Sequence, residues 1–266
     1  MAARPTPTAL TIAGSDSGGG AGVQADLNTF AALGIHGATA VTCVTAQNPA
    51  RVIAIEPCSD GLLRRQLEAI FEEFNPAAAK TGMLFSSSLI RVVARFFRTR
   101  SKQPLVVDPV MVATSGARLL KPEAIKTLEN ELLPRATLIT PNLPEAELLL
   151  GTVLKTPEDL RAAARELHRR FGCAALVKGG HLRGVKHAVD VFYDGRNELV
   201  LAAPFIRGLH THGTGCTYSA AITAHLARGS SLHKAVEQAK EFITAAIARR
   251  RQVDGHTVLG WSPRAD

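Results

Sequence analysis

The fold is decided near the N-terminus by Thr8-Ala-Leu-Thr-Ile-Ala13, followed by Gly14-Ser-Asp-Ser-Gly-Gly-Gly-Ala-Gly22 and then by Val23 to Leu33. The first run is β-prone, and the last has the apolar spacing of a helix. A strand, a glycine-rich loop and a helix form the opening of a βαβ unit. The glycines do not have the spacing of a P-loop or of a dinucleotide fingerprint. The loop nevertheless follows a strand, where ligands usually bind in an open α/β sheet.

Strand and helix patterns alternate along the rest of the chain. We expect strands at 38–45, 77–82, 104–109, 137–140 and 174–181, a hairpin turn at 194–195 between 188–193 and 198–202, and helices at 61–74, 88–98, 122–133, about 143–150, 156–171 and 232–250. This alternation predicts an α/β fold with a doubly wound, mostly parallel sheet and helices on both faces. Because no linker or repeat interrupts it, we expect residues 1–266 to form a single domain.

A second glycine-rich stretch, His210-Thr-His-Gly-Thr-Gly-Cys216, runs into a helix that should end at Gly229. Gly213 and Gly215 allow unusual backbone dihedral angles and close approach by a ligand. The first amides of the helix have no intrahelical acceptor and lie at the positive end of its dipole, which makes them a ready site for phosphate. A helix that merely begins after a flexible loop is the alternative.

The amino-acid composition of the chain indicates which class of ligand it binds. The net charge of +8 comes from scattered arginines, and the one tight basic run, Arg249-Arg250-Arg251, is expected at a helix end. Aromatic residues make up only 5% of the chain, so the interleaved basic and aromatic pattern of a nucleic-acid site is missing. Anionic small molecules fit this composition better. The four cysteines do not have the spacing of a zinc site, which suggests that they are reduced thiols. Because the sequence shows neither a signal sequence nor an apolar run of bilayer length, we expect a soluble, cytoplasmic protein with no membrane partner.

Two polar side chains near the first two strands are candidates for substrate contact. Asp26, four residues after Gly22, could point into the crevice from the first helical turn, although an acidic residue at a helix start is as good an explanation. Gln47 follows a strand, and its amide offers a donor and an acceptor that suit an aminopyrimidine or pyridine edge. Taken alone, it could equally be a surface glutamine.

Four polar residues near later strand ends suggest a site for magnesium and phosphate. Asp108 ends an apolar strand, where a carboxylate can hold magnesium or its water, although Asp-Pro is also a turn signal. Asn142 and Glu145 flank a short helix start and could face magnesium or phosphate. Lys178 ends a strand and is well placed for a nucleotide phosphate, unless it is simply solvated.

The motifs also occur together in the order of a known family. They are Ala13 to Asp26, Ala46-Gln-Asn48, Asp108-Pro-Val-Met111 with Ser115-Gly116, Ile139-Thr-Pro-Asn-Leu-Pro-Glu145, Lys178-Gly-Gly-His181 and Thr211-His-Gly-Thr-Gly-Cys216. This ordered set closely resembles the hydroxymethylpyrimidine/phosphomethylpyrimidine kinases of thiamine biosynthesis, which have the ribokinase-like fold. The resemblance implies ATP-dependent phosphorylation of 4-amino-5-hydroxymethyl-2-methylpyrimidine and then of its monophosphate. It covers essentially the whole chain.

By matching positions, the resemblance also implies the site. The pyrimidine pocket would be lined by Gly14, Asp26, Gln47, Met83, Val110 and Cys216. ATP would lie near Lys178, Thr211, His212, Gly213 and Lys240, with magnesium near Asp108, Asn142 and Glu145. Gly213, Thr214, Gly215 and Cys216 would form the anion hole, with Lys178 assisting catalysis. A homodimer is expected by analogy with the family.

Cys216 is the expected general base. A thiol at a helix N-terminus usually has a lowered pKa, and the thiolate could accept the proton of the substrate hydroxyl. Sugar kinases of the same fold resemble this arrangement but carry an aspartate at the position of Cys216. A purely structural cysteine is the alternative.

The sequence departs from the family pattern in two places, and other functions stay open. Pro49-Ala-Arg51 replaces the usual Thr-Gly segment of a loop expected over the substrate, and Asp254 to Trp261 only loosely matches the usual ending. A pyridoxal or pyridoxine kinase of the same fold is the nearest rival. A non-catalytic pyrimidine sensor and a dinucleotide oxidoreductase are others, the latter disfavoured by the missing fingerprint.

Overall fold

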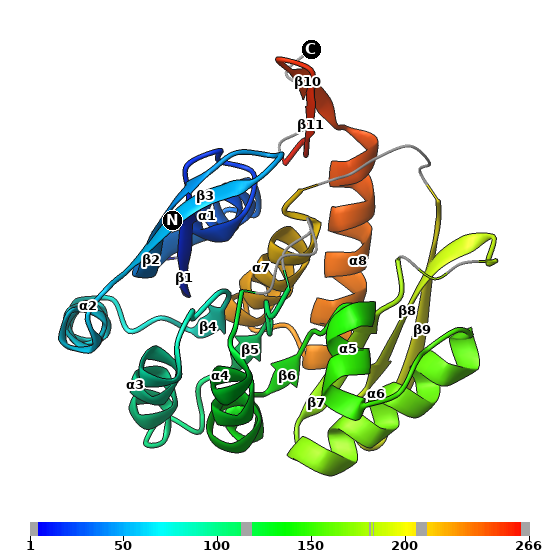
Figure 1. Cartoon of the computed structure of the whole chain (residues 1–266), viewed down its shortest axis with the longest axis horizontal. Coiled ribbons are helices and arrows are strands. Elements are labelled where there is room, and N and C mark those ends of the chain that lie inside the picture. The colour runs from blue at the N-terminus through cyan, green and yellow to red at the C-terminus, as the bar shows by residue number, and fades with distance from the viewer. Residues whose placement is uncertain (1–4, 113–118, 181, 183, 206–211, 262–266) are drawn as a thin grey trace.

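The computed structural model describes residues 5–112, 119–180, 182, 184–205 and 212–261. Within them, one sheet has nine strands in the order β3-β2-β1-β4-β5-β6-β7-β8-β9 (Figure 1). The strands are β1 Thr8–Asp16, β2 His36–Gln47, β3 Val52–Pro57, β4 Ala78–Thr81, β5 Leu105–Val107, β6 Leu138–Ile139, β7 Ala174–Lys178, β8 His187–Tyr193 and β9 Glu198–Pro204. Neighbours from β2 to β7 pair in parallel, and β3, β8 and β9 add antiparallel edges.

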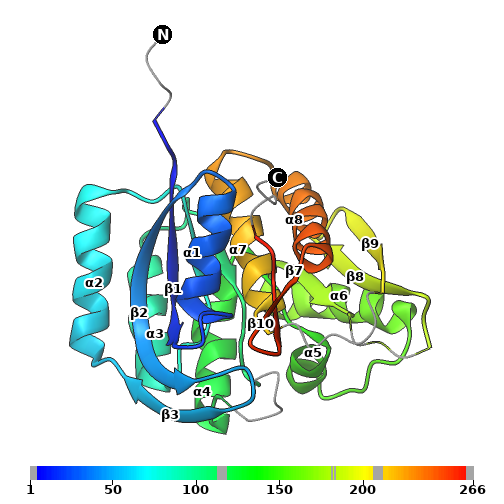
Figure 2. The same ribbon diagram turned by 90° about the horizontal axis from the view of Figure 1, so that it is seen from above.

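Helices cover both faces of this sheet (Figures 1 and 2). One face packs against α1 Gly22–Ala32, α7 Thr214–Ala227 and α8 Leu232–Ala248. The other packs against α2 Asp60–Glu73, α3 Ser87–Phe97, α4 Pro122–Thr127, α5 Leu143–Leu150 and α6 Pro157–Phe171. The expected doubly wound, mostly parallel α/β fold is therefore confirmed.

Local signals explain several helix ends. Thr156 and Asp159 form a reciprocal capping box at the start of α6, at the position where the helix is expected to begin. Gly229 has a φ of +85° just after α7, which suits the expected glycine stop. Small residues along α7 allow it to approach β1, β4 and β5 closely, and from Thr217 to Ala227 the helix is buried throughout.

The sequence prediction misses three features. β3 is absent from it, because exposed residues on this edge strand do not give a clear apolar alternation. The predicted helix at 122–133 ends as an α-helix at Thr127 and continues as a π-turn and a 3₁₀ turn to Arg135. The last helix ends at Ala248 rather than Arg250, and Arg251 begins a small hairpin of β10 Arg251–Val253 and β11 His256–Val258.

Two adjacent leucines of α2 test the packing of this helix on the sheet. Leu63 is 0% exposed, whereas Leu62 is 51% exposed. Leu63→Ala should lower the free energy of unfolding by about 2–5 kcal/mol, because it leaves a cavity in the core. Leu62→Ala should change it by less than about 0.5 kcal/mol, since the side chain already faces water. Chemical denaturation of both variants makes the comparison, and equal losses would contradict the described packing.

Candidate active site

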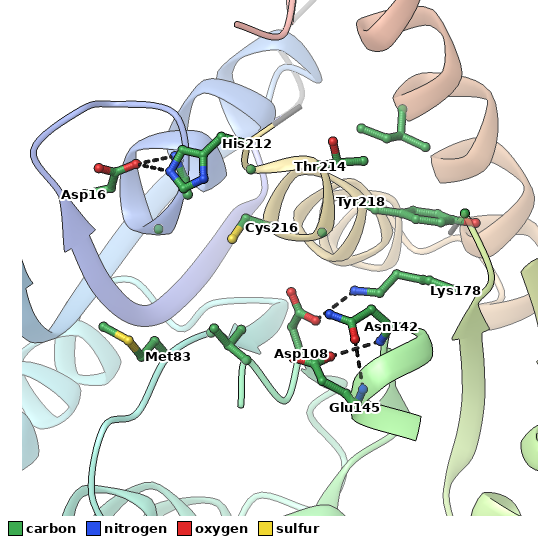
Figure 3. A pocket seen from close by; sticks show the side chains of 18 of the residues that line it. Asp16, Met83, Asp108, Asn142, Glu145, Lys178, His212, Thr214, Cys216 and Tyr218 are labelled. Atoms are coloured by element: carbon green, nitrogen blue, oxygen red, sulfur yellow. Dashed lines mark hydrogen bonds and ion pairs between the residues drawn. The ribbon is translucent and has the colours of Figure 1, made fainter. Parts of the chain in front are cut away.

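A cavity of about 370 Å³ opens at the carboxyl ends of the parallel strands, a size within the range of roughly 300–1,000 Å³ typical of small-molecule sites (Figure 3). The N-terminal turn of α7 faces it. The expected site residues that line it are Gly14, Gln47, Met83, Asp108, Val110, Asn142, Glu145, Lys178, His212, Gly213, Thr214, Gly215, Cys216 and Lys240. Tertiary structure thus brings together residues from along nearly the whole chain. Thr211 lies outside the described residues.

The start of α7 has the form expected of an anion site. Gly213 caps the helix with a left-handed φ of +82°, and a Cβ there would collide with the carbonyl oxygen of Gly20. Gly215 does not have a positive φ. A Cβ at Gly215 would lie 3.2 Å from Lys178 Nζ and 3.7 Å from Asp108 Oδ2, so the second glycine provides space rather than an unusual dihedral angle. The expectation of unusual dihedral angles therefore holds for Gly213 alone.

Asp108 connects four elements below this helix start. Its Oδ1 accepts hydrogen bonds from Lys178 Nζ at 3.0 Å and from Thr140 Oγ1 at 3.2 Å. Its Oδ2 accepts one from Ser219 Oγ, in the next turn of α7, at 3.3 Å. Burial lowers the pKa of Lys178, but Asp108 and Glu145 outweigh burial and hold that pKa above its ordinary value. Lys178 therefore presents a fixed positive charge to the cavity.

Asn142 and Glu145 hold the neighbouring wall through a reciprocal capping box at the start of α5. Glu145 Oε2 accepts a hydrogen bond from the backbone N–H of Asn142 at 3.0 Å, and its Oε1 accepts one from the backbone N–H of Met111 at 3.0 Å. The second bond fixes the turn that contains Val110, whose φ of +42° is strained for a β-branched residue. Burial, with the negative charge of Asp108, raises the pKa of Glu145 to about 7.

His212 joins two other segments at the opposite wall of the cavity. Its Nε2 lies 2.9 Å from Asp16 Oδ2 and 3.0 Å from Gln47 Nε2. Burial raises the pKa of Asp16, but hydrogen bonds from His212 and from the backbone amides of Gly18 and Ala21 outweigh it, so the net pKa is lowered. The glycine loop, through Asp16, and the end of β2, through Gln47, therefore both contact His212 just before α7, and Figure 3 shows Asp16 and His212 facing each other.

The far end of the cavity contains a further ion pair. Lys240 Nζ of α8 donates to Asp190 Oδ2 at 2.7 Å, and Asp190 Oδ1 accepts from the Gly179 amide at 3.0 Å. Tyr218 lies beside this pair, and burial followed by the negative charge of Asp190 raises the pKa of its hydroxyl well above the ordinary value. Lys240 lines the cavity as expected, and its ammonium is held by a carboxylate of β8.

Asp26 departs from the sequence expectation. It was expected in the pocket, but it does not belong to the cavity lining and is 0% exposed. Its Oδ1 accepts a 2.7 Å hydrogen bond from Lys80 Nζ, and its Oδ2 accepts one of 2.6 Å from Thr11 Oγ1. The side chain turns toward the sheet because the buried ammonium of Lys80 pairs with it there.

The pKa expected for Cys216 is also wrong. Cys216 lies in the first turn of α7 and lines the cavity, as the sequence implies. Burial raises the pKa of its thiol to about 11, although the Lys80 ammonium and a hydrogen bond from the Gly22 amide lower it. The loss of hydration exceeds the stabilisation that a helix N-terminus gives, because a thiolate needs solvent or several close donors.

Comparison with known proteins identifies the family. The family described as phosphomethylpyrimidine kinase matches residues 16–259. The chain is 45% identical over 239 residues to the hydroxymethylpyrimidine/phosphomethylpyrimidine kinase of Bacillus subtilis (strain 168), an alignment that covers 90% of this chain and 88% of that protein. The chain belongs to the phosphomethylpyrimidine kinase family. It is therefore a kinase, and the family resemblance seen in its motifs is confirmed.

Solved structures support the same fold for this family member. A phosphomethylpyrimidine kinase from Clostridium difficile 630 has a TM-score of 0.81 and 41% identity, with 91% of this chain and 100% of that chain covered. An ADP complex of Bacillus subtilis pyridoxal kinase has a TM-score of 0.89 and 40% identity, with 96% and 97% covered. In the part of the chain that the structure describes, no helix has the length and apolarity needed to cross a membrane.

Sequence reasoning did not single out three polar residues in or below the site of this kinase. Asp16 stands within the quoted glycine loop and organises it, whereas Asp190 pairs with Lys240 and Lys80 pairs with Asp26. Lys80 and Asp190 are charged residues inside short apolar strands, and this interruption is the signal that could have found them. A buried charge must be paired, so each implies a partner from another element.

The two left-handed glycines at opposite ends of α7 test the anion site. Gly213→Ala should reduce kinase turnover at least about 100-fold, because the added Cβ displaces the amides that would face the transferred phosphoryl group. Gly229→Ala, with the same φ sign but open space around its Cβ, should cost about 1 kcal/mol of stability and leave turnover near that of the parent. Steady-state kinetics and thermal unfolding compare the two; similar turnover would contradict this role.

Proposed function

We propose that this family member uses ATP to phosphorylate 4-amino-5-hydroxymethyl-2-methylpyrimidine and then its monophosphate, giving the diphosphate for thiamine biosynthesis. The observation that carries the proposal is the placement of the α7 N-terminus, with Cys216 in its first turn, across one cavity from the polar side chain of Gln47 and the apolar wall at Met83. The family match over residues 16–259 supports the same substrate class. We place this activity in the cytoplasm and infer a homodimer from the family resemblance.

The pyrimidine would bind on the side of the cavity formed by the glycine loop, the end of β2 and the turn after β5. Met83 and Val110 offer apolar contact to a ring, and Gly14 leaves room beside Met83 for close approach. Gln47 offers an amide whose donor and acceptor can pair with the edge of an aminopyrimidine. The hydroxymethyl group would then face Cys216.

ATP would extend its phosphates toward the start of α7. The backbone amides at the start of α7, from Gly213 to Cys216, would stabilise the charge of the transferred phosphoryl group, because helix N-terminal amides favour anions. Lys178, fixed by Asp108, would add a positive charge beside Gly215. His212 and Lys240 border the remaining nucleotide space. Phosphoryl transfer depends mainly on such positioning and charge stabilisation.

The acidic residues of the site fit magnesium. Asp108 and Glu145 are buried carboxylates whose like charges repel, and the repulsion contributes to the raised pKa of Glu145, so a divalent cation would relieve it. Magnesium is commonly bound by one or two carboxylates together with substrate phosphates and water. We assign its binding, or that of its water, to Asp108 and Glu145, with Asn142 beside them. When bound, magnesium would neutralise phosphate charge.

Cys216 is the proposed base for the substrate hydroxyl. As the hydroxyl oxygen forms its bond to the γ-phosphorus, the bond from that phosphorus to the β–γ bridging oxygen breaks. The hydroxyl proton passes to the thiolate, the S–H bond forms, and ADP leaves. In the second reaction the acceptor is already a phosphate monoester, so the base is needed chiefly for the first.

Pyridoxal is the second candidate substrate. The structural match to a pyridoxal kinase, with 40% identity and a TM-score of 0.89, specifically favours it. A pyridine ring could use the same apolar wall, and Gln47 could face its ring hydroxyl. The two substrates differ in the ring edge that they present to Gln47. Substrate preference therefore separates the two candidates.

A coupled ATP-consumption assay tests the proposed substrates. Hydroxymethylpyrimidine, its monophosphate and pyridoxal are offered separately with ATP and magnesium. We expect turnover of both pyrimidines, because the cavity joins a ring-binding wall to the anion site. Turnover of pyridoxal alone would instead assign the chain to vitamin B6 phosphorylation. Absence of turnover with all three, alongside retained pyrimidine binding, would favour the non-catalytic pyrimidine sensor.

The pH dependence of the first phosphorylation tests Cys216. With a thiol pKa of about 11, the thiolate fraction near neutral pH is small and rises about tenfold per pH unit, so kcat should rise with pH from about 7 to 9. Cys216→Ala should lower kcat at least about 100-fold while nucleotide binding persists. Cys216→Asp should flatten the pH profile above pH 7, since a carboxyl there, even with its pKa raised as far as that of Glu145, to about 7, is mostly ionised over this range. An equal slope in the aspartate variant, or full turnover in the alanine variant, would exclude the thiol as base.

A further inference from the structure

A fully buried ion pair lies outside the cavity lining and has no part in the mechanism above. Lys80 of β4 and Asp26 of α1 are joined at 2.7 Å, and both side chains are 0% exposed. Thr11 of β1 donates to the other carboxylate oxygen of Asp26 at 2.6 Å. A buried pair of this kind gives little or no net stability over apolar side chains of the same size. Stability therefore does not explain why this ion pair is buried between the sheet and α1.

The alternation of side chains along β4 places Lys80 below α7. Ala78 packs in the apolar cluster of α1, α7 and α8, and Ala79 packs in the cluster on the opposite face. Lys80, two residues after Ala78, must point to the same face as Ala78. Its strand neighbour in β5 is Val106, so Asp108, two residues further along, also approaches α7, where Ser219 contacts it. Lys80 therefore lies on the α7 side of the sheet. The Gly22 amide at the start of α1 contacts the Cys216 thiol, and Asp26, which binds Lys80, lies one turn further along the same face of α1. Lys80 and Cys216 are thus brought together at this face of α1.

Charged groups on four neighbouring segments have opposing effects on the ionisation of the Cys216 thiol. Lys80 from β4 and Lys178 from β7 favour the thiolate, and Asp26 from α1 and Asp108 from the turn after β5 oppose it. Lys178 is held by Asp108 at 3.0 Å and faces the phosphate side of the cavity. Asp26 first, then Cys216 and Asp108, hold the pKa of Lys80 above its ordinary value although burial lowers it, so Lys80 stays charged.

We propose that Lys80, fixed by Asp26 and Thr11 on the α7 face of the sheet, is the buried cation that stabilises the thiolate form of Cys216. Lys80 is a positioning residue, because it acts on the reaction through the thiol and does not line the cavity. Asp26 holds the ammonium of Lys80 in place, and its negative charge at the same time reduces the stabilisation that Lys80 gives to the Cys216 thiolate. The proposal rests on the proposed role of Cys216 as base, and it gives a reason for a lysine inside a short buried strand.

Alkylation of Cys216 by iodoacetamide measures this effect without any need for turnover. The rate is followed by mass spectrometry of the Cys216 peptide in the intact, folded protein between about pH 7 and pH 10, with Cys58 in the same sample as the control for reagent and exposure. Lys80→Met should slow alkylation of Cys216 about threefold, because a tenfold smaller thiolate fraction is partly offset by greater nucleophilicity. Asp26→Asn, which removes the opposing negative charge, should accelerate it by a similar factor.

The two variants are expected to change the alkylation rate of Cys216 in opposite directions, and this difference separates an electrostatic effect from a packing effect. If loosened packing were the only effect, both variants would accelerate alkylation, and that result would overturn the proposal, as would unchanged rates in both. Should Lys80→Met fail to fold, a second variant, Lys80→Gln, keeps a hydrogen-bond donor for Asp26 but removes the positive charge, so it should also slow alkylation of Cys216. Unchanged turnover in Cys216→Ala would reject the base role alone, whereas the alkylation rates judge Lys80 separately.

Discussion

Asp108 accepts hydrogen bonds from Thr140 after β6, Lys178 at the end of β7 and Ser219 in α7, and the arrangement of the cavity depends on these contacts. They hold the first turns of α7 against the carboxyl edge of the sheet. A buried carboxylate without such donors would carry a large desolvation cost, so the fold and the site constrain each other here. Gly215 leaves the space in which Lys178 and Asp108 can approach the helix.

The cavity places opposite charges side by side, since Lys178 is paired with Asp108. In our proposal Lys178 and the amides of α7 bind phosphate, and Asp108 with Glu145 binds magnesium. Lys240 is paired with Asp190 at the far end, and His212 is paired with Asp16 at the near end. This distribution is the basis for the proposed binding of a nucleotide and magnesium beside a small ring.

Burial changes the chemistry expected of individual residues. A helix N-terminus by itself predicts a reactive thiolate at Cys216, yet burial raises the pKa of that thiol to about 11. Asp26 was expected in the pocket because it follows a glycine loop, and it lies instead in a buried pair with Lys80. The wrong predictions for Cys216 and Asp26 have the same cause. The sequence shows which polar groups exist near a motif, whereas solvation and the choice of partner depend on elements that are distant along the chain.

The sequence by itself determined the doubly wound sheet, most helix positions, the family and a set of site residues of which all the described ones except Asp26 line the cavity, because apolar periodicity and glycine motifs are local properties. It also pointed to Asn142 and Glu145, which form the capping box of α5. Tertiary structure alone decided that β3 adds an antiparallel edge, that Lys80 receives Asp26, and that Asp16 meets His212 across nearly the whole chain. Pairing of buried charges and of sheet edges depends on which segments meet in space, and no local pattern encodes that meeting.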